Sequence, residues 1–135
     1  MIKIPGAPPL REEKLLVGRF SASIIQALSL NISNGTPIFL SENNRIHIQE
    51  HHPDAYSKYF DCISDIIEFP DYIGIAGVQA ASIEYIKRFN VGTEYVNVAV
   101  RATKRGTYYV RSMFIIEESK LNNYIKKGKL KRLTN

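Results

Sequence analysis

The sequence is poor in the residues that build disulfides, thiolate metal clusters and membrane spans. Cys62 is its single cysteine, which excludes an intrachain disulfide and a zinc site made of several thiolates. No apolar run approaches the ~20 residues that a membrane-spanning helix needs, and the chain does not open with a signal segment. We therefore expect a cytoplasmic protein with no membrane partner. Delivery as the released toxin end of a longer polypeptide is the alternative.

The chain does have enough apolar material for one domain. Its 135 residues include 8 tyrosines and 6 phenylalanines, and 44% of the residues are hydrophobic. This length is close to the commonest size of a single domain. Residues 1–9 contain three prolines and a glycine, which predicts an extended arm or linker. Residues 10–135 are then expected to form the domain.

Positive charge is concentrated in the last part of the chain. Residues 1–86 carry six basic and ten acidic side chains, a net charge of −4. Residues 87–135 carry twelve basic and three acidic side chains, a net charge of +9. A one-sided positive field attracts polyanions and speeds their encounter. The distribution indicates a nucleic acid partner, although a basic surface without a partner would show the same pattern.

Helical patterns fill most of the first half. In residues 10–30 apolar side chains recur at helical spacing with an interruption at Gly18, which predicts one broken helix or two short ones. Residues 34–37, with the sequence Asn-Gly-Thr-Pro, predict a turn. A short strand is expected to follow at residues 38–40.

A helix bearing the histidines is expected next. Ser41 or Asn43 is suited to cap its N-terminus. Proline clashes with a preceding helical turn, so Pro53 predicts that this helix stops near His52. Proline is well suited to begin the following helix, whose apolar positions lie on one face until Pro70 breaks it.

After Pro70 the pattern changes to β structure. Residues 82–89 are ambiguous between a helical turn and an irregular crossing. A short helix is expected after Ser119, with Gly128 as its stop. Strands are predicted in three segments, the last two forming a hairpin around a turn at residues 104–106: 72–77, 94–103 and 107–116. Helices first and then a mostly antiparallel sheet indicate the α+β class.

All three histidines lie within the stretch "RIHIQEHHP". His47, Glu50 and His51 spell H-x-x-E-H, a pattern of some zinc peptidases in which two histidines on one helix face hold the ion and the glutamate acts as a base. A catalytic zinc needs a third protein ligand, and no other residue has a spacing that marks it as one. Pro53 also ends the helix one residue past the pattern. We therefore expect no metal and no cofactor.

Two other interpretations of the cluster stay open. The histidines either lie on a solvated helix end without a role, or they transfer protons without a metal. Histidine both takes and gives a proton near neutral pH, and RNA carries its own nucleophile in the 2′-hydroxyl. The predicted hairpin offers cations and hydroxyl groups for such a reaction: Arg101, Lys104, Arg105, Arg111, Tyr108, Tyr109 and Ser112.

Several segments together resemble a known nuclease group. They are "RIHIQEHHPDAYSKYFDCISDIIEFPDYIGI", "SIEYIKRF", "YVNVAVRATKRGTYYVRSMFII" and "KLNNYIKKGKLKRL". The most telling pieces are H-I-x-x-x-H-P, then F-P-D-Y-I, then the hairpin ending V-R-S-x-F. In their order and spacing they resemble the phage-associated barnase/EndoU/colicin/RelE-like nuclease group, in particular the third of its phage subfamilies. The resemblance covers roughly residues 15–133.

The resemblance implies a fold and an activity. The implied fold is α+β, with N-terminal helices packed on one face of a mainly antiparallel sheet of about four strands. The implied activity is that of a metal-independent endoribonuclease of toxin or prophage contexts, in a bacterial or phage-infected cell. Attack by the 2′-hydroxyl would leave 2′,3′-cyclic phosphate and 5′-hydroxyl ends. The residues that match the family's site are His47, His52, Arg101 and Ser112.

Further residues and partners complete this hypothesis. The doubled His51-His52 leaves open which ring faces the site, and Tyr109 and Arg111 are reserve candidates. The expected partners are RNA, with tRNA among the candidates, and an immunity or antitoxin protein. The alternatives are a non-catalytic RNA- or protein-binding domain that binds through its basic tail, and a zinc hydrolase. The cations expected to contact RNA are Lys104, Arg105, Lys126, Lys127, Lys129, Lys131 and Arg132.

Alternation along the hairpin predicts which side chains share a face. On the first strand Val96, Val98 and Val100 should face the core, with Asn97, Ala99 and Arg101 opposite them. On the second strand the same rule groups Ser112 with Tyr108, Val110, Phe114 and Ile116. We also expect the ring of His47 to face the sheet near Arg101 rather than solvent, since a phosphate needs a proton carrier and a cation close together.

Overall fold

The computed structural model describes residues 14–76, 82–89 and 94–133, so the predicted arm at residues 1–9 lies outside the described residues. The strands are β1 (Lys14–Arg19), β2 (Pro37–Ser41), β3 (Tyr72–Ala76), β4 (Ser82–Phe89), β5 (Glu94–Ala102), β6 (Tyr108–Ile116) and β7 (Leu130–Arg132). The helices are α1 (Ala22–Ala27), α2 (Glu42–His51), α3 (Pro53–Tyr59), α4 (Ile63–Glu68) and α5 (Glu118–Lys126), with a 3₁₀ turn at Phe60–Cys62. None of the described helices is long and apolar enough to cross a membrane.

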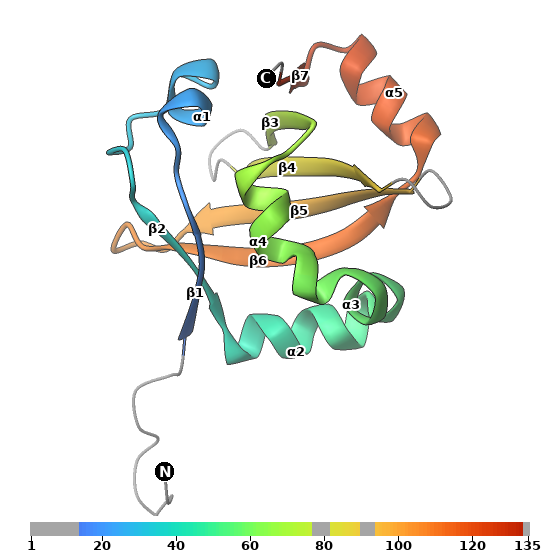
Figure 1. Cartoon of the computed structure of the whole chain (residues 1–135), viewed down its shortest axis with the longest axis horizontal. Coiled ribbons are helices and arrows are strands. Elements are labelled where there is room, and N and C mark those ends of the chain that lie inside the picture. The colour runs from blue at the N-terminus through green and yellow to red at the C-terminus, as the bar shows by residue number, and fades with distance from the viewer. Residues whose placement is uncertain (1–13, 77–81, 90–93, 134–135) are drawn as a thin grey trace, which may run out of the picture.

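The strands form one sheet in the order β1-β2-β6-β5-β4-β3-β7 (Figure 1). All neighbouring strands pair antiparallel except β2 and β6, which are parallel. The α+β class is therefore confirmed, but the expectation of about four strands was wrong, because the described sheet has seven. The helices are also not confined to the N-terminal part, since α5 follows β6.

The predicted helix at residues 10–30 was wrong in its first half. Residues 14–19 form the edge strand β1, which pairs with β2. A Cβ atom at Gly18 would lie 2.8 Å from Cγ2 of Ile67, so only glycine allows β1 to pass this close to α4. Pairing with a strand about 20 residues later overrides the local helical spacing. The second half does form the short helix α1, capped by Ser21.

Other local predictions were confirmed or refined. The turn before β2 and the hairpin of β5 and β6 lie where the sequence places them, with Gly35 and Gly106 at positive φ. The helix expected from Pro53 is divided into α3, a 3₁₀ turn and α4. The ambiguous segment at residues 82–89 is the strand β4, in the middle of the sheet.

The main core lies between one face of the sheet and α4. Val96, Val98 and Val100 of β5 are fully buried on this face, as predicted, together with Ile66 and Ile67 of α4. On the opposite face a smaller cluster packs under α5, made of Ile86, Ile116, Leu121 and Leu130. Helix α5 covers only one end of this second face.

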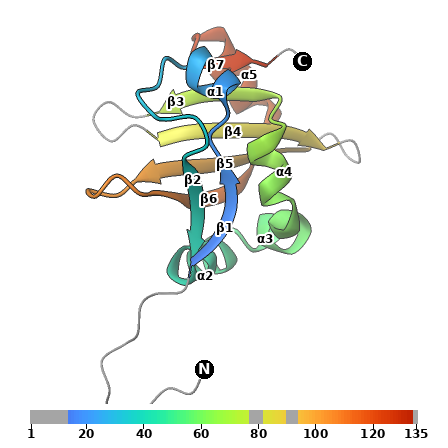
Figure 2. The same ribbon diagram turned by 60° about the vertical axis from the view of Figure 1, so that its left-hand side comes forward.

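The edge of β6 is paired with β2 only at its start, where Ile38 and Phe39 oppose Tyr108 and Tyr109. Helices α2 and α3 pack against β6, with α2 beside the strand in both views (Figures 1 and 2). The junction between α2 and α3 therefore lies next to the second face of the sheet.

Candidate active site

Helix α2 places the histidines, and the sequence sets both of its ends. The Ser41 hydroxyl accepts a hydrogen bond from the backbone nitrogen of Asn44 at 3.1 Å, which confirms the predicted N-cap. The helix ends at His51, and Pro53 begins α3. A proline at the first helical position lacks only a backbone donor that would be unused there, so the boundary follows directly from the sequence.

Two contacts fix how α2 is turned about its axis. Ile48 is fully buried, and the guanidinium of Arg45 donates to the hydroxyl of Tyr56 on α3 at 2.9 Å. Residues four apart share a helix face. One flank of α2 is therefore polar along its whole length, through Asn43, His47 and His51.

The three imidazole rings form one cluster at the end of α2. The ring centroids of His47 and His51 lie 4.4 Å apart, and those of His47 and His52 lie 6.4 Å apart. His52 alone also packs on an aromatic ring of the sheet, 5.6 Å from Phe114 of β6. His52 is half-buried while the other two are exposed. Of the doubled pair, His52 is thus the one that lies against the sheet.

The orientation of His47 differs from the expectation. Its ring is exposed rather than directed into the sheet near Arg101. Successive helical residues point about 100° apart, and Ile48 already occupies the position that faces the core. His47 is therefore left on the flank, where its aromatic neighbours are the other two histidines.

The surroundings of His52 favour its neutral form. Removal from water lowers the pKa of its imidazole from the ordinary value of 6.5, and the nearby His47 and His51 lower it further. A neutral imidazole at neutral pH is able to accept a proton. This environment suits a general base.

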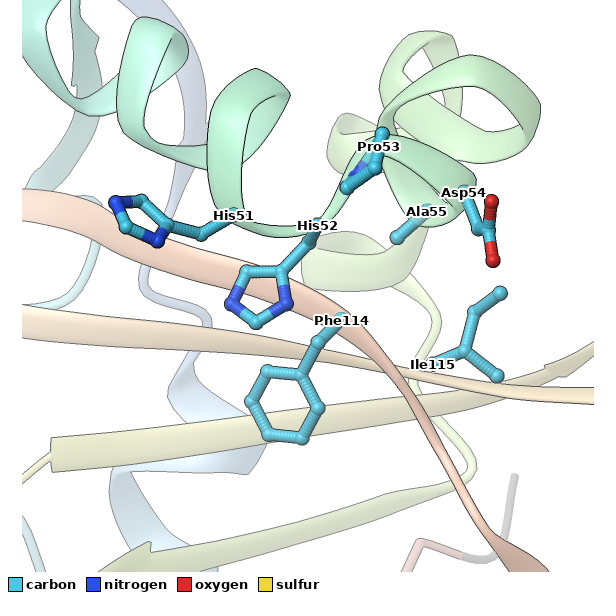
Figure 3. Close-up of a pocket in the computed structure, with 7 residues that line it drawn as sticks. All are labelled: His51, His52, Pro53, Asp54, Ala55, Phe114 and Ile115. Atoms are coloured by element: carbon cyan, nitrogen blue, oxygen red, sulfur yellow. The ribbon is translucent and has the colours of Figure 1, made fainter.

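A hollow of about 210 Å³ opens beside His52. We call it the histidine hollow; it is lined by His51, His52, Pro53, Asp54, Ala55, Phe114 and Ile115 (Figure 3). Figure 3 shows the His52 ring directed toward Phe114 and the His51 ring directed away from it. The walls are mostly apolar or aromatic, and Asp54 adds one carboxylate.

A second hollow of about 260 Å³ lies at the other end of α2. We call it the arginine hollow; it is lined by Ser41, Asn43, Asn44, Arg101, Ala102, Thr103, Tyr109 and Arg111. Two of the three arginines of the hairpin, Arg101 and Arg111, thus meet in one place. Tyr109 also lies 6.1 Å from Phe39 of β2, measured between ring centroids. The structure therefore brings Arg101 together with the reserve candidates Tyr109 and Arg111, in a hollow separate from that of His52.

A β-bulge in β6 decides where Ser112 points. Ala99 pairs with Ser112 and Val100 pairs with Val110, so Arg111 is the extra residue. The simple alternation predicted for this strand is therefore wrong: Met113, not Ser112, is buried with Val110 in the main core. Ser112 instead shares the second face with Ala99 and, through its register, with Arg101.

Glu84 is a buried carboxylate on this face of the sheet that was not among the predicted catalytic residues. Its backbone pairs with Ala99, which in turn pairs with Ser112, so a small residue separates two polar ones across three strands. Burial raises the pKa of the Glu84 carboxyl, partly offset by a hydrogen bond from Ser82 at 3.2 Å, by the Asn97 amide and by the charge of Arg101. A buried carboxyl with a raised pKa is typical of functional sites as well as of structural networks. Once residues 82–89 are known to be a strand, alternation alone places Glu84 opposite the core-facing Ile83 and Tyr85.

Asn97 completes this buried polar group. It is only 2% exposed, and its side-chain nitrogen makes no hydrogen bond of normal geometry among the described residues. Its amide nevertheless lies close enough to the Glu84 carboxyl to lower the pKa of that carboxyl. A buried polar group with an incomplete set of hydrogen bonds destabilises the fold, and the Tyr85 hydroxyl on the core-facing side of β4 is in the same situation.

The remaining predicted cations lie in two separate places. Lys104 and Arg105 are exposed at the hairpin tip, directly after Thr103 of the arginine hollow. The tail cations lie on α5, β7 and the link between them, and Figures 1 and 2 both show α5 far from the hairpin tip. Lys131 has a structural contact, because its ammonium donates to the Ala27 carbonyl at 2.7 Å.

The zinc alternative depends on a third ligand near His47 and His51. Among the residues that the structure describes, no three His, Cys, Asp or Glu side chains come together to hold a metal ion. Cys62 is a free thiol on the 3₁₀ turn before α4. The H-x-x-E-H pattern therefore supplies two neighbouring imidazoles here without the donor set of a catalytic zinc site.

One comparison with known proteins identifies a family. Residues 15–123 match the family model described as phage-Barnase-EndoU-ColicinE5/D-RelE like nuclease3. The match extends from β1 to most of α5. It therefore includes the residues of both hollows and also Glu84, Ala99 and Ser112 on the sheet. No curated protein and no solved structure matches the chain. The chain belongs to this family of phage-associated nucleases.

Proposed function

We propose that this nuclease is a metal-independent endoribonuclease that cleaves RNA by attack of a 2′-hydroxyl on the neighbouring phosphate. One observation carries the proposal: the half-buried His52 lies beside a sheet face that bears Ser112 and Arg101, in a chain of a nuclease family. RNA brings its own nucleophile. Two proton carriers and a cation therefore suffice for the reaction.

In the first step His52 acts as the base. It takes the proton of the 2′-hydroxyl as the 2′-oxygen forms a bond to phosphorus. Its lowered pKa supports this role, since the imidazole is then mostly neutral at neutral pH. The Ser112 hydroxyl donates to one oxygen of the phosphorane, and the guanidinium of Arg101, in the separate arginine hollow, stabilises the negative charge through its positive field.

In the second step the bond between phosphorus and the 5′-oxygen breaks. His47 gives a proton to this leaving oxygen, so the products are a 2′,3′-cyclic phosphate and a 5′-hydroxyl end. Support for the pairing comes from the 6.4 Å between the His47 and His52 rings. A positive charge on His47 disfavours a second charge on His52, which lowers the pKa of His52.

The proposed biological setting follows from the family and from the charge. The cations at the hairpin tip extend the arginine hollow, and the tail cations add a long-range field that attracts RNA, tRNA among the candidates. We place the activity in the cytoplasm of a bacterial or phage-infected cell, as a toxin or prophage nuclease. An immunity or antitoxin protein would then be needed to protect the host.

The direct test is cleavage of RNA by the purified protein in excess EDTA. We expect cleavage to persist, and we expect His52→Ala to lower turnover by about 10²- to 10⁴-fold, the range for loss of a general base. His51→Ala is the matched control, because it removes the neighbouring imidazole that points away from Phe114. It should change turnover by less than about tenfold, since only a contribution to the His52 pKa is lost.

Two further readouts separate the alternatives. A substrate with one 2′-deoxynucleotide at the cleavage position should resist cleavage there, because the nucleophile is missing. Loss of all cleavage in EDTA with recovery on addition of Zn²⁺ would instead establish a metal-dependent hydrolase. Retained RNA affinity with no cleavage in any buffer would establish a binding domain that lacks the chemistry.

A further inference from the structure

We propose that one unpaired RNA strand lies along the groove between α2 and β6, with a phosphate in the arginine hollow and a base in the histidine hollow. This inference rests on the proposed ribonuclease function and adds to it the form of the substrate and the position of its parts. The two hollows are the observations that carry it.

The two hollows are the two ends of one path. The start of α2 lines the arginine hollow through Asn43 and Asn44, and its end lines the histidine hollow through His51. β6 follows the same direction, with Arg111 in the first hollow and Phe114 in the second. Between them, His47 lies on the polar flank of α2. A strand that fills both hollows therefore passes the proposed acid and base.

The length of the path fits a few nucleotides. Arg111 and Phe114 are three positions apart on β6, which corresponds to ~10 Å at ~3.3 Å per residue. A base enters the histidine hollow only when it is unstacked and turned out of its strand. Proteins read RNA in this way at single-stranded segments, whereas the bases of a duplex are inaccessible to such a site.

The charges assign the phosphate to the arginine hollow. Its lining holds Arg101 and Arg111 together with amide and hydroxyl groups, and it includes no carboxylate. Guanidinium groups bind phosphate in a bidentate manner. Neither arginine forms an ion pair within the described residues, so both remain available to a ligand.

The charges assign a base to the histidine hollow. The carboxylate of Asp54 repels phosphate, while Phe114, Ile115 and Pro53 offer apolar surface to a flat ring. An ionised carboxylate only accepts hydrogen bonds. It therefore favours adenine, cytosine or guanine, which carry an amino group, over uracil, whose single N–H lies between two carbonyl oxygens.

The test is binding of fluorescent 2′-fluoro RNA octamers, measured by anisotropy. These octamers lack the 2′-hydroxyl nucleophile, so the measurement does not depend on cleavage. We expect the single strands of adenine and of cytosine to bind at least about fivefold more tightly than that of uracil, and more tightly than a duplex of the same length. Asp54→Ala should remove most of the discrimination against uracil.

A charge-matched pair of variants tests the arginine hollow. The double variant Arg101→Ala/Arg111→Ala should weaken binding by about tenfold or more and reduce the salt slope by ~0.7, the value for one neutralised phosphate on a single strand. Lys126→Ala/Lys127→Ala removes the same charge at the end of α5 and its C-cap. The factor by which it weakens binding should be several times smaller than that of the arginine variant. All four side chains are exposed, and circular dichroism would verify that each variant is folded.

Defined outcomes overturn the inference. Equal weakening by the two double variants would mean that RNA binds through general positive charge and not through the groove. Equal affinity for single strand and duplex, or an unchanged preference in Asp54→Ala, would refute the assignment of the hollows. If binding shows the expected pattern while natural RNA is not cleaved, the proposed position of the RNA strand is supported and the proposed ribonuclease function is refuted.

Discussion

Phe114→Ala should raise the pKa of His52 and slow catalysis. Burial is the largest cause of the lowered pKa of His52, ahead of the charges on His47 and His51. Phe114 is the only described aromatic ring of the sheet that packs on this imidazole, with 5.6 Å between ring centroids. Removal of the ring exposes the imidazole to water, which stabilises its charged form. The pKa should then move back toward 6.5.

The expected size of the catalytic effect follows from the ring contact. Pairs of packed rings contribute ~0.5–1.5 kcal/mol beyond the area that they bury. If that energy holds His52 in its reactive position, its loss lowers turnover roughly two- to twelvefold. The acidic limb of the pH–rate profile should also shift to higher pH, since a base with a higher pKa becomes protonated earlier as the pH falls.

The assay is an NMR titration of the imidazole resonances, combined with a pH–rate profile on one RNA substrate. His47→Ala should raise the pKa of His52 less than Phe114→Ala does, because the charge on His47 ranks below burial as a cause. Phe69→Ala is the matched control: it deletes an exposed phenylalanine, 55% accessible, at the break after α4. An unchanged His52 pKa in Phe114→Ala would show that this ring does not create the environment of the base.

Two further predictions concern stability. Glu84→Gln should raise the free energy of unfolding at pH 7. Because the pKa of Glu84 is raised in the folded chain, ionisation of this carboxyl favours the unfolded chain at pH values above about 4.5 and has no effect below it. The stabilisation by Glu84→Gln, measured by urea denaturation, should therefore vanish in acid. Gly74→Ala should destabilise by about 3 kcal/mol or more, because a Cβ there would lie 2.7 Å from Leu130 and closer still to the Lys129 carbonyl. Gly35→Ala, which meets no atom within 4 Å, should cost only the ~1–2 kcal/mol of a left-handed residue, and equal melting temperatures of the two variants would contradict this account of β3 and β7 packing.

The sequence predicts those parts of the fold that local signals decide. The cap at Ser41, the helix boundary at Pro53 and the turn at Gly106 each depend on a few adjacent residues, and all three are confirmed. β1 depends instead on pairing with β2 and on the missing side chain at Gly18, which local spacing does not reveal. β7 has three residues and exists only as a partner of β3, so the number of strands was underestimated.

In the candidate site, too, some features follow from local sequence and others depend on how distant strands pair. The histidine cluster and the hairpin arginines follow from residue types and helix spacing, and the structure places His51 and His52 in one hollow and Arg101 and Arg111 in another, at opposite ends of α2. The bulge at Arg111 shifts the alternation of β6 by one residue, so alternation alone wrongly grouped Ser112 with Val110. Glu84 was missed because its strand was not recognised, and its burial depends on neighbours in β5.

The two faces of β5 carry different kinds of side chain. Val96, Val98 and Val100 are fully buried and stabilise the fold against α4, so that face has no room for polar chemistry. The opposite face carries Asn97 and Arg101, and α5 covers only its far end. An apolar residue at Asn97 would avoid the cost of a buried amide without a full set of hydrogen bonds. This strand thus carries the main core on one face and residues of the proposed site on the other.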